Sequence, residues 1–460
     1  MEHKFDQLSE LPEPVLAHLL SFIPLKKILQ LSILSKRWQN VWILFPIPKF
    51  DESLVWSGSY KKKEREQLVY ERKRDEFSYF VEKTLLSHYR QKLSIKKIKL
   101  RILNIDDDES YCTRVNRWIG YAIENNVKEL ELYVRPHKYY QVSESVLVAK
   151  SITQLTLWGC NLESLIHSDI NLSSLKKLVL GQVCNVEDQF LQTLIAGCPV
   201  VEEIIFARCD GLKNIHVSGL PKLMAIEVVF NPELESIEIE ASNLESLLIK
   251  LSEPCQINLL PCENLNKLEL YSATVTDKWL HGVLSKHPLI ESLNLNRCDM
   301  LKRIKISSDR MKSLTFFRCS ELVEINVVTP NLHRLEYCGY VISFSSNIST
   351  LSEVKLEFAR PIALNAQKIE FLTKLNHPKL LTWRVGSTQN VITSKEFRKI
   401  QPSPLYNVKQ LKLLAVFIPT RDEINKLVDA LLWISPLLET LSIEWGHAII
   451  SFKVLYLFIS

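Results

Sequence analysis

The sequence predicts an α/β chain in which a small three-helix N-terminal module precedes a long, curved solenoid of short repeats. Two observations carry this prediction. Apolar residues near the N-terminus recur at the spacing of one helix face, and the rest of the chain carries a recurrent L-x-x-L-x-L pattern. The length of 460 residues suits a small module followed by an extended array better than a single globule.

Composition excludes several classes of function. Only 11 glycines are present, which argues against glycine-rich phosphate loops. The 10 cysteines include no C-x-x-C pair, so zinc-finger spacing is absent. No signal peptide is visible at the polar N-terminus, and no apolar run reaches the roughly 18–20 residues that span a bilayer. We therefore expect free thiols, no metal, no cofactor, no membrane partner, and a location in the cytosol, the nucleus or both.

Positive charge is concentrated between residues 57 and 101, where Lys and Arg clearly outnumber Asp and Glu. This stretch includes the run Lys61–Lys63 and the cluster Arg72–Arg74. A nuclear-import signal is one interpretation, and a solvated helix face with mixed charges is the other, favoured one. Aromatic residues are not interleaved with the charges in the way a nucleic-acid groove requires, so we expect no nucleic-acid partner.

Residues 11–42 predict three short helices. Pro12 stands at the start of the first, where its fixed φ and missing N–H cost nothing, and Pro24 ends it. The third helix includes Trp38. About fifty residues cannot cover all this apolar surface, which favours a docking face for the helices of a partner. The alternative is that these side chains only pack on the following domain.

The segment LPEPVLAHLLSFIPLKKILQLSILSKRWQNVW resembles the F-box over about residues 8–48. The resemblance depends on Leu11-Pro12, the spaced apolar positions, Pro24, and Leu34-Ser-Lys-Arg-Trp38 in the right order. In that family the motif binds a Skp-type adaptor, which links to a cullin scaffold. Carried over by position, the adaptor contacts are expected at Leu11, Pro12, Leu16, Leu19, Leu20, Ile33, Leu34 and Trp38.

The L-x-L part of each repeat predicts a short strand whose two leucines point inward. Several copies continue to a cysteine that follows a turn, at Cys160, Cys209, Cys298 and Cys319. A thiol at this position fits inside the coil and donates weakly to backbone carbonyls. We therefore interpret these four cysteines as structural, with a redox or metal role as the less favoured alternative.

Two kinds of coil are predicted. Some coils are about 21–26 residues long and return through a helix, expected at 113–125, 188–196 and 277–286. Elsewhere, around 212–249 and 301–337, the motif recurs about every 10–11 residues, too closely for a helix. These coils should carry two strands, one on each side of the solenoid, so that helix-backed coils alternate with all-β coils.

Nearly the whole chain resembles the large plant-type family of F-box proteins with leucine-rich repeats. Phrases such as Cys319-Ser-Glu-Leu322 and Pro330-Asn-Leu332 are typical of it, whereas the C-terminal FBD motif of many relatives is not visible. We expect an F-box at 1–50, a basic helical linker at 51–92, the solenoid at 93–445 and an apolar tail at 446–460. The tail is either a truncated end or a segment that packs on the last coil.

The strand face of a solenoid presents the residues between and after the leucines. The position after L-x-L includes four aromatics, Tyr133, Trp158, Tyr271 and Phe317, and also Gly181 and Ala207. Aromatics are frequent hot-spot residues, so these four are the candidate target-binding positions. The alternative is that each ring lies flat on a neighbouring coil.

No nucleotide, zinc-protease or serine-hydrolase motif occurs, so we expect no catalytic residue and a chain that is not itself an enzyme. The resemblance implies a substrate-recognition subunit of an SCF-type (Skp–cullin–F-box) ubiquitin ligase with an unknown target protein. Competing hypotheses are a non-degradative scaffold or inhibitor, a receptor that binds a small ligand as glue, and a truncated chain that binds the adaptor but no target.

Overall fold

The computed structural model describes residues 11–12, 15, 19, 49–54, 64–90, 95–103, 105, 109–135, 139–165, 168–346, 348, 351–359, 363–375 and 378–454. The chain divides into two compact units, residues 1–235 and 236–460. Each unit is built from coils that contribute one strand to a parallel sheet and then return through a helix, a short 3₁₀ turn or a second strand.

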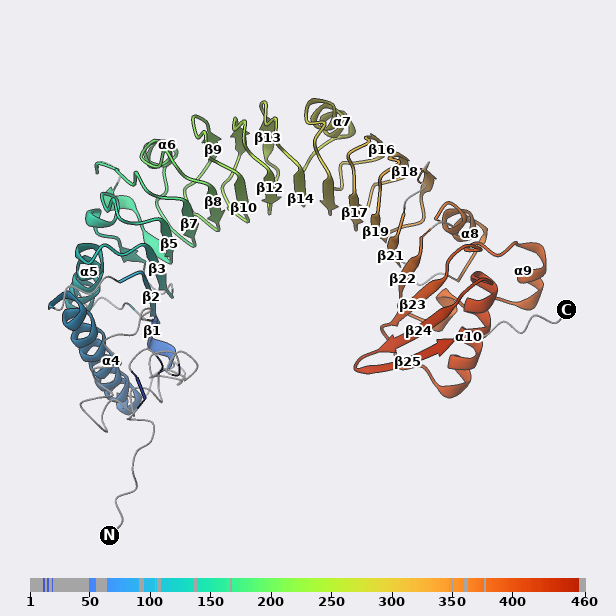
Figure 1. Cartoon of the computed structure of the whole chain (residues 1–460), viewed down its shortest axis with the longest axis horizontal. Helices are drawn as coiled ribbons and strands as arrows, with labels where there is room; N and C mark the ends of the chain where they lie inside the picture. The colour runs from blue at the N-terminus through green and yellow to red at the C-terminus, as the bar shows by residue number, and fades with distance from the viewer. Residues whose placement is uncertain are drawn as a thin grey trace, which may run out of the picture. The chain divides into compact units, whose positions relative to one another are not determined.

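Among the described residues of the first unit, seven strands pair in parallel in chain order (Figure 1). Alternate side chains point inward, so the leucine positions form a continuous column in which Leu100 is in register with Leu132, and Leu132 with Leu157. All three leucines are buried. The strands are β1 (Lys49–Asp51), β2 (Lys97–Ile102), β3 (Glu129–Val134), β5 (Gln154–Trp158), β7 (Lys177–Gly181), β8 (Glu203–Ala207) and β10 (Ala225–Val229).

Helices, 3₁₀ turns and short strands form the other side of the coils of this unit. Helix α6 has the bounds predicted from the sequence, and α5 begins four residues earlier than predicted because Tyr111 adds to its buried face. The return elements are η2 (Glu52–Leu54), α4 (Glu64–Arg90), α5 (Glu109–Glu124), β4 (Tyr140–Gln141), η3 (Glu144–Val146), β6 (Cys160–Asn161), η4 (Glu163–Leu165), α6 (Asp188–Ala196) and β9 (Asn214–Val217).

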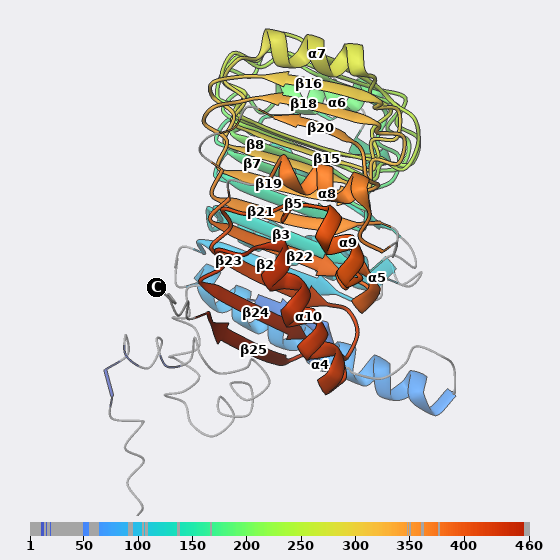
Figure 2. The same cartoon turned by 90° about the vertical axis from the view of Figure 1, so that its right-hand side faces the viewer.

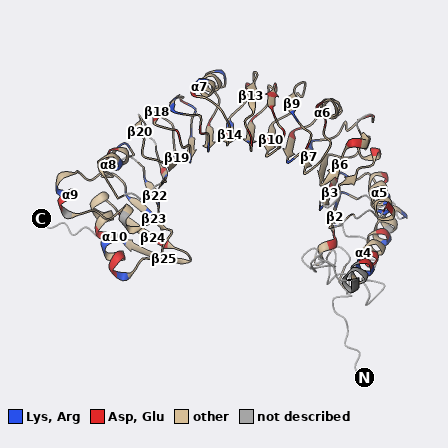
Figure 3. Cartoon of the chain, turned by 180° about the vertical axis from the view of Figure 1, so that it is seen from behind, with Lys and Arg blue, Asp and Glu red and all other residues tan. Residues whose placement is uncertain are grey.

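Helix α4 lies within the segment expected to be a basic helical linker, and it packs against α5. Phe77 meets Trp118 edge-on with 6.2 Å between ring centroids, and Arg114 pairs with Asp75 at 3.0 Å. Both signs of charge occur along α4, as Figure 3 shows. Strand β1, which precedes α4, is in register with β2. The parallel sheet therefore includes residues 49–51, and the domain boundaries proposed from the sequence stay predictions.

The described part of the second unit forms a sheet of nine parallel strands followed by one antiparallel strand. The last strand, β25, lies beside β24 (Figure 2), with Leu441 opposite Phe452. Residues 448–453 therefore pack on the last coil, which was one of the two alternatives for the apolar tail. The strands are β12 (Ser246–Lys250), β14 (Lys267–Tyr271), β15 (Ser292–Asn296), β17 (Ser313–Phe317), β19 (Arg334–Gly339), β21 (Glu353–Phe358), β22 (Leu380–Val385), β23 (Gln410–Ala415), β24 (Thr440–Trp445) and β25 (Ala448–Lys453).

The predicted alternation of helix-backed and all-β coils is confirmed in this unit. Second strands replace helices where the motif recurs too closely, and they pair in parallel with one another. Helix α7 has its predicted bounds and is capped by the side chain of Thr276. The return elements are β11 (Ser236–Ile239), β13 (Gln256–Leu259), α7 (Asp277–Lys286), β16 (Arg303–Ser307), β18 (Glu324–Val328), β20 (Ser343–Ser346), α8 (Ala366–Thr373), η5 (Thr388–Asn390), α9 (Lys395–Ile400) and α10 (Arg421–Ile434).

The four repeat cysteines are buried, as predicted, and all ten cysteines of the chain are free thiols. Their Sγ atoms donate to backbone carbonyls: Cys209 to Leu180 at 3.4 Å and Cys319 to Leu295 at 3.6 Å. Burial raises the pKa of Cys209 to about 12. The Cys209 thiol is therefore held in its neutral form, which is typical of buried structural cysteines.

Candidate functional site

The N-terminal docking face is described at four positions. Pro12 and Leu19 are exposed, Leu11 is half-buried, and the Pro12 carbonyl accepts a hydrogen bond from the Val15 amide at 2.9 Å. Val15 and Leu19 are helical, one turn apart and both exposed, so they project from the same side. The other five predicted adaptor contacts, Leu16, Leu20, Ile33, Leu34 and Trp38, lie outside the described residues.

In the first unit the parallel register aligns the last outward positions of successive strands into a row. Arg101 is in register with Tyr133, Tyr133 with Trp158, and Trp158 with Gly181. The rings of Tyr133 and Trp158 are stacked, with centroids 6.4 Å apart and planes inclined by 29°. Two of the four predicted target-binding residues are therefore neighbours in space, although 25 positions separate them in the chain.

Trp158 is fixed in place by the coil that follows it. Its Nε1 donates to Oε1 of Gln182 at 2.7 Å. A Cβ atom on Gly181 would lie 2.0 Å from Cε3 of Trp158, so the indole lies directly on the glycine backbone. Gly181 is therefore buried under the indole, and Ala207, which is in register with Gly181, is buried as well; both findings correct the prediction that these positions face solvent. Alternation gives the direction of a side chain but not what a larger neighbour covers.

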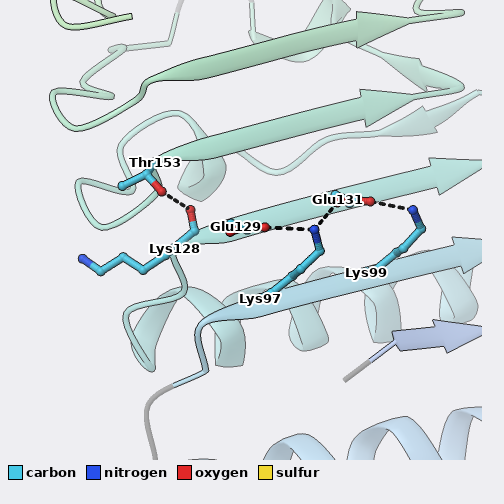
Figure 4. Close-up of polar contacts among 6 residues, drawn as sticks. All are labelled: Lys97, Lys99, Lys128, Glu129, Glu131 and Thr153. Carbon is cyan, nitrogen blue, oxygen red and sulfur yellow. Dashed lines mark hydrogen bonds and ion pairs between the residues drawn. The ribbon is translucent and has the colours of Figure 1, made fainter. Parts of the chain in front are cut away.

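Beside this row, charged side chains form ladders across β2 and β3 (Figure 4). Nζ of Lys97 lies 2.9 Å from Glu129 and 2.6 Å from Glu131, and Nζ of Lys99 lies 2.6 Å from Glu131. The hydrogen bonds that Lys97 donates to Glu131 and Glu129 raise the pKa of Lys97. Burial alone would raise the pKa of Glu131, but the hydrogen bonds from Lys97 and Lys99 outweigh it and lower that pKa.

A hollow of about 610 Å³ opens at the carboxyl ends of these strands. Its volume lies within the range of ordinary ligand sites. Tyr133 and Trp158 line it together with three cationic side chains, and Lys99 lies over the ring of Tyr133 with Nζ 4.4 Å from the centroid. The full lining is Lys99, Arg101, Ile102, Leu103, Tyr133, Val134, Arg135, Trp158 and Gln182.

The other two predicted target-binding residues occur in the second unit and are half-buried. The hydroxyl of Tyr271 donates to Glu269 at 3.0 Å and accepts from the amide of Asn294 at 3.0 Å, while Lys250 lies over its ring. Phe317 has the guanidinium of Arg318 over its ring at 5.2 Å. These rings are tied to polar neighbours, and Tyr271 and Phe317 belong to different strands, β14 and β17.

Reasoning from the sequence missed Arg101, Arg135 and Gln182. Each lies within or just after an L-x-L strand, and each comes from a different coil. The signal that finds them is the strand register, because aligning the L-x-L motifs places Arg101 beside Tyr133 and Gln182 directly after the residue opposite Trp158.

Parallel strands, one from each coil, inward leucine columns and mixed return segments define a leucine-rich-repeat protein. A family model described as the At1g61320/AtMIF1 LRR domain matches residues 86–260 and 254–443, and an F-box domain model matches residues 8–49. The chain therefore belongs to the plant-type F-box proteins with leucine-rich repeats, which confirms the resemblance drawn from its motifs.

The relatives that it matches are proteins of Arabidopsis thaliana. F-box/LRR-repeat protein At3g03360 is 24% identical over 321 residues, which cover 67% of this chain and 60% of that protein. F-box/FBD/LRR-repeat protein At4g26340 is 27% identical over 333 residues, or 70% of this chain and 71% of that protein. F-box protein At4g27050 is 33% identical over 207 residues, or 43% and 44%. The chain thus spans 60% of the length of the first of these relatives.

Among the described residues, no group of three or more His, Cys, Asp or Glu side chains is placed to hold a metal ion. No helix within the described ranges is both long and apolar enough to cross a bilayer.

Proposed function

We propose that this chain is a substrate-recognition subunit of an SCF-type ubiquitin ligase, located in the cytosol, the nucleus or both. The F-box binds a Skp-type adaptor and through it a cullin, and the strand face of the repeats binds a target protein. The observation that carries the proposal is that one chain joins an F-box match at 8–49 to a leucine-rich-repeat match that continues to residue 443.

The proposed chemistry of the chain is positioning. Holding a target close to a charged conjugating enzyme raises the effective concentration of the acceptor lysine, and ubiquitin transfer itself takes place on partner subunits. The chain needs no catalytic residue for this role. Exposed Val15 and Leu19 support an adaptor contact at the N-terminus, because exposed apolar side chains on one face are typical of docking surfaces.

The test is affinity purification of the full chain from plant cells, with and without Leu11→Ala and Pro12→Ala together. We expect recovery of the adaptor and the cullin to fall at least tenfold, whereas proteins bound to the repeats are retained. Leu289→Ala is the matched control, since Leu289 is an exposed leucine (38%) of the second unit. Unchanged recovery of the adaptor by the double variant, or no cullin with the unaltered chain, would favour the non-degradative scaffold.

A further inference from the structure

The hollow at the carboxyl ends of β2, β3 and β5 combines two kinds of surface that proteins use together for recognition. One wall is the stacked pair Tyr133 and Trp158; Gly181 and Gln182 hold the Trp158 ring, and Tyr133 lies between that ring and Lys99. Because the pair is fixed before anything binds, it offers an apolar contact without the entropic cost of ordering flexible side chains. Such preorganised aromatic residues are the usual anchors of an interface.

The other wall is cationic. Lys99, Arg101 and Arg135 line the hollow, and none of its lining residues within the described part of the chain is acidic. The guanidinium of Arg101 has Asp51 at 3.8 Å, yet its side chain is 56% exposed, whereas the Asp51 side chain is only 6% exposed. Arg135 is exposed as well. Two guanidinium groups at the rim of an aromatic hollow complement a carboxylate, which accepts two parallel N–H bonds from arginine.

The surroundings of the hollow narrow the class of partner. Glu129 and Glu131 lie on the same strand face, within ion-pair distance of Lys97 and Lys99. A nucleic acid needs a continuous basic track for its phosphates, and these carboxylates interrupt one. Small-molecule sites bury most of their ligand, whereas the arginines here remain exposed at the rim. A short acidic segment of a protein needs neither a continuous basic track nor full burial, so it fits this surface.

We infer that the hollow lined by Arg101, Arg135, Tyr133 and Trp158 binds an acidic peptide segment of the target, with a carboxylate on the arginines and an adjacent apolar side chain against Trp158. This inference rests on the proposed function, because it names the chemical class of target that the repeats recognise. It places target recognition in the first unit, on the coils that follow α4.

The test measures fluorescence anisotropy of labelled peptides with the full chain. The probe peptide is Asp-Glu-Leu-Asp-Glu, and Asn-Gln-Leu-Asn-Gln is its uncharged counterpart. We expect binding of the acidic probe only, weakening as salt rises from 50 to 300 mM. Arg101→Gln and Arg135→Gln together should raise its Kd about tenfold or more. The matched control is Arg384→Gln, because Arg384 also occupies a strand, is 57% exposed and has a carboxylate, Glu357, at 3.9 Å; its Kd should stay within twofold.

Three results would overturn the inference. These are equal binding of both peptides, equal loss with Arg384→Gln, and binding that appears only after Asp106, Asp107 and Asp108 are changed to Asn. The last result would identify the acidic run of the chain itself as the occupant. Recovery of the adaptor and the cullin by the Arg101→Gln, Arg135→Gln chain is measured in parallel. If this recovery persists while the peptide results fail, the inference is wrong and the proposed ligase function stands; if the unaltered chain recovers no cullin, the proposed function fails independently.

Discussion

Aromatic residues stand on the strand face of both units, but their neighbours differ. In the first unit, Tyr133 and Trp158 occupy consecutive coils, stack on each other and border a hollow with cationic walls. In the second unit, the Tyr271 hydroxyl is hydrogen-bonded to Glu269 and Asn294. Phe317 lies two strands further along the sheet. The same position after L-x-L thus carries a preorganised anchor in one unit and a polar network in the other.

This difference shows that exposure and residue type do not define a recognition site in a repeat protein. What matters is the residue at the same position in the next coil. Gly181 leaves room for the indole of Trp158 to lie flat. The residue in register with Tyr271 is Asn296, which has a side chain, and the nearby Asn294 donates a hydrogen bond to the tyrosine hydroxyl. A site arises where a large ring is followed by a residue without a side chain.

The sharpest way to break the comparison is to change a glycine in each unit. Gly181→Ala places a Cβ atom 2.0 Å from the Trp158 ring, so the indole must move away. It then loses both the stacking on Tyr133 and the hydrogen bond to Gln182. We expect a loss of about 2–3 kcal/mol in the free energy of unfolding, together with loss of acidic-peptide binding. Urea unfolding of the full chain and peptide anisotropy measure the two effects.

Gly339→Ala in the second unit is the control for this prediction. A Cβ atom there would lie 2.9 Å from the Tyr337 hydroxyl and 3.1 Å from Cζ of the same ring, so the overlap is much smaller than the 2.0 Å contact at Gly181. We expect about 1 kcal/mol and unchanged peptide binding. Equal losses in the free energy of unfolding from Gly181→Ala and Gly339→Ala would show that replacing Gly181 has no effect specific to the Trp158 ring.

Removing the aromatic ring itself separates a binding role from packing. Trp158→Ala should raise the Kd of the acidic peptide about tenfold, because it deletes the apolar wall, while Phe317→Ala should leave the Kd within twofold. Both rings are half-buried, so each variant should lose only about 1–2 kcal/mol of stability. Aggregation of the Trp158→Ala chain, with the Phe317→Ala chain intact, would mean that the indole is part of the core.

Much of the scaffold could be predicted from the sequence because the same L-x-L motif recurs in successive coils. Every L-x-L motif fixes a strand and its inward face, and the spacing to the next motif decides whether a helix fits between them; α6 and α7 have the predicted bounds for this reason. The inward cysteines follow from the same register, and the Cys209 thiol donates to the Leu180 carbonyl of the preceding coil.

The hollow was not predictable from the sequence in the same way. Its lining comes from four strands or their ends, and each contribution becomes meaningful only when the register sets Arg101 beside Tyr133 and Trp158 beside Gly181. The alternation of side chains predicted Tyr133 and Trp158 on the strand face, where they lie. It also predicted Gly181 as exposed, but Gly181 is covered by the Trp158 ring. For the adaptor face, Leu11, Pro12 and Leu19 have described positions, and the contacts themselves stay predictions.

The smallest expected effect concerns two half-buried glutamates, one in each unit. Glu131 and Glu269 have similar side-chain exposure, 17% and 14%, and the hydrogen bonds of both outweigh burial and lower the carboxyl pKa. A lowered pKa stabilises the folded chain above the ordinary value of 4.5, and this stabilisation is lost as the pH falls through the lowered pKa. Glu131→Gln and Glu269→Gln should each flatten the acid side of the stability profile, by about 0.5–1 kcal/mol near neutral pH.

The two variants should nevertheless differ in their response to salt, because the partners of the two glutamates differ. Glu131 lies between two lysines, so a glutamine there removes an ionic link and the loss should shrink as salt rises. Glu269 has a single lysine partner among the described residues, Lys267 at 2.5 Å, and it also accepts from the Tyr271 hydroxyl and the Asn294 amide. A glutamine oxygen can still accept these two neutral bonds, so the loss at Glu269 should be smaller and less sensitive to salt. Hydrogen exchange of the β2–β3 and β14–β15 amides at pH 4 and 7, in 50 and 500 mM salt, reads each site locally. Equal salt dependence at both sites would contradict the proposed contrast between Glu131, which is held by two lysines, and Glu269, which is held by one lysine and two neutral donors.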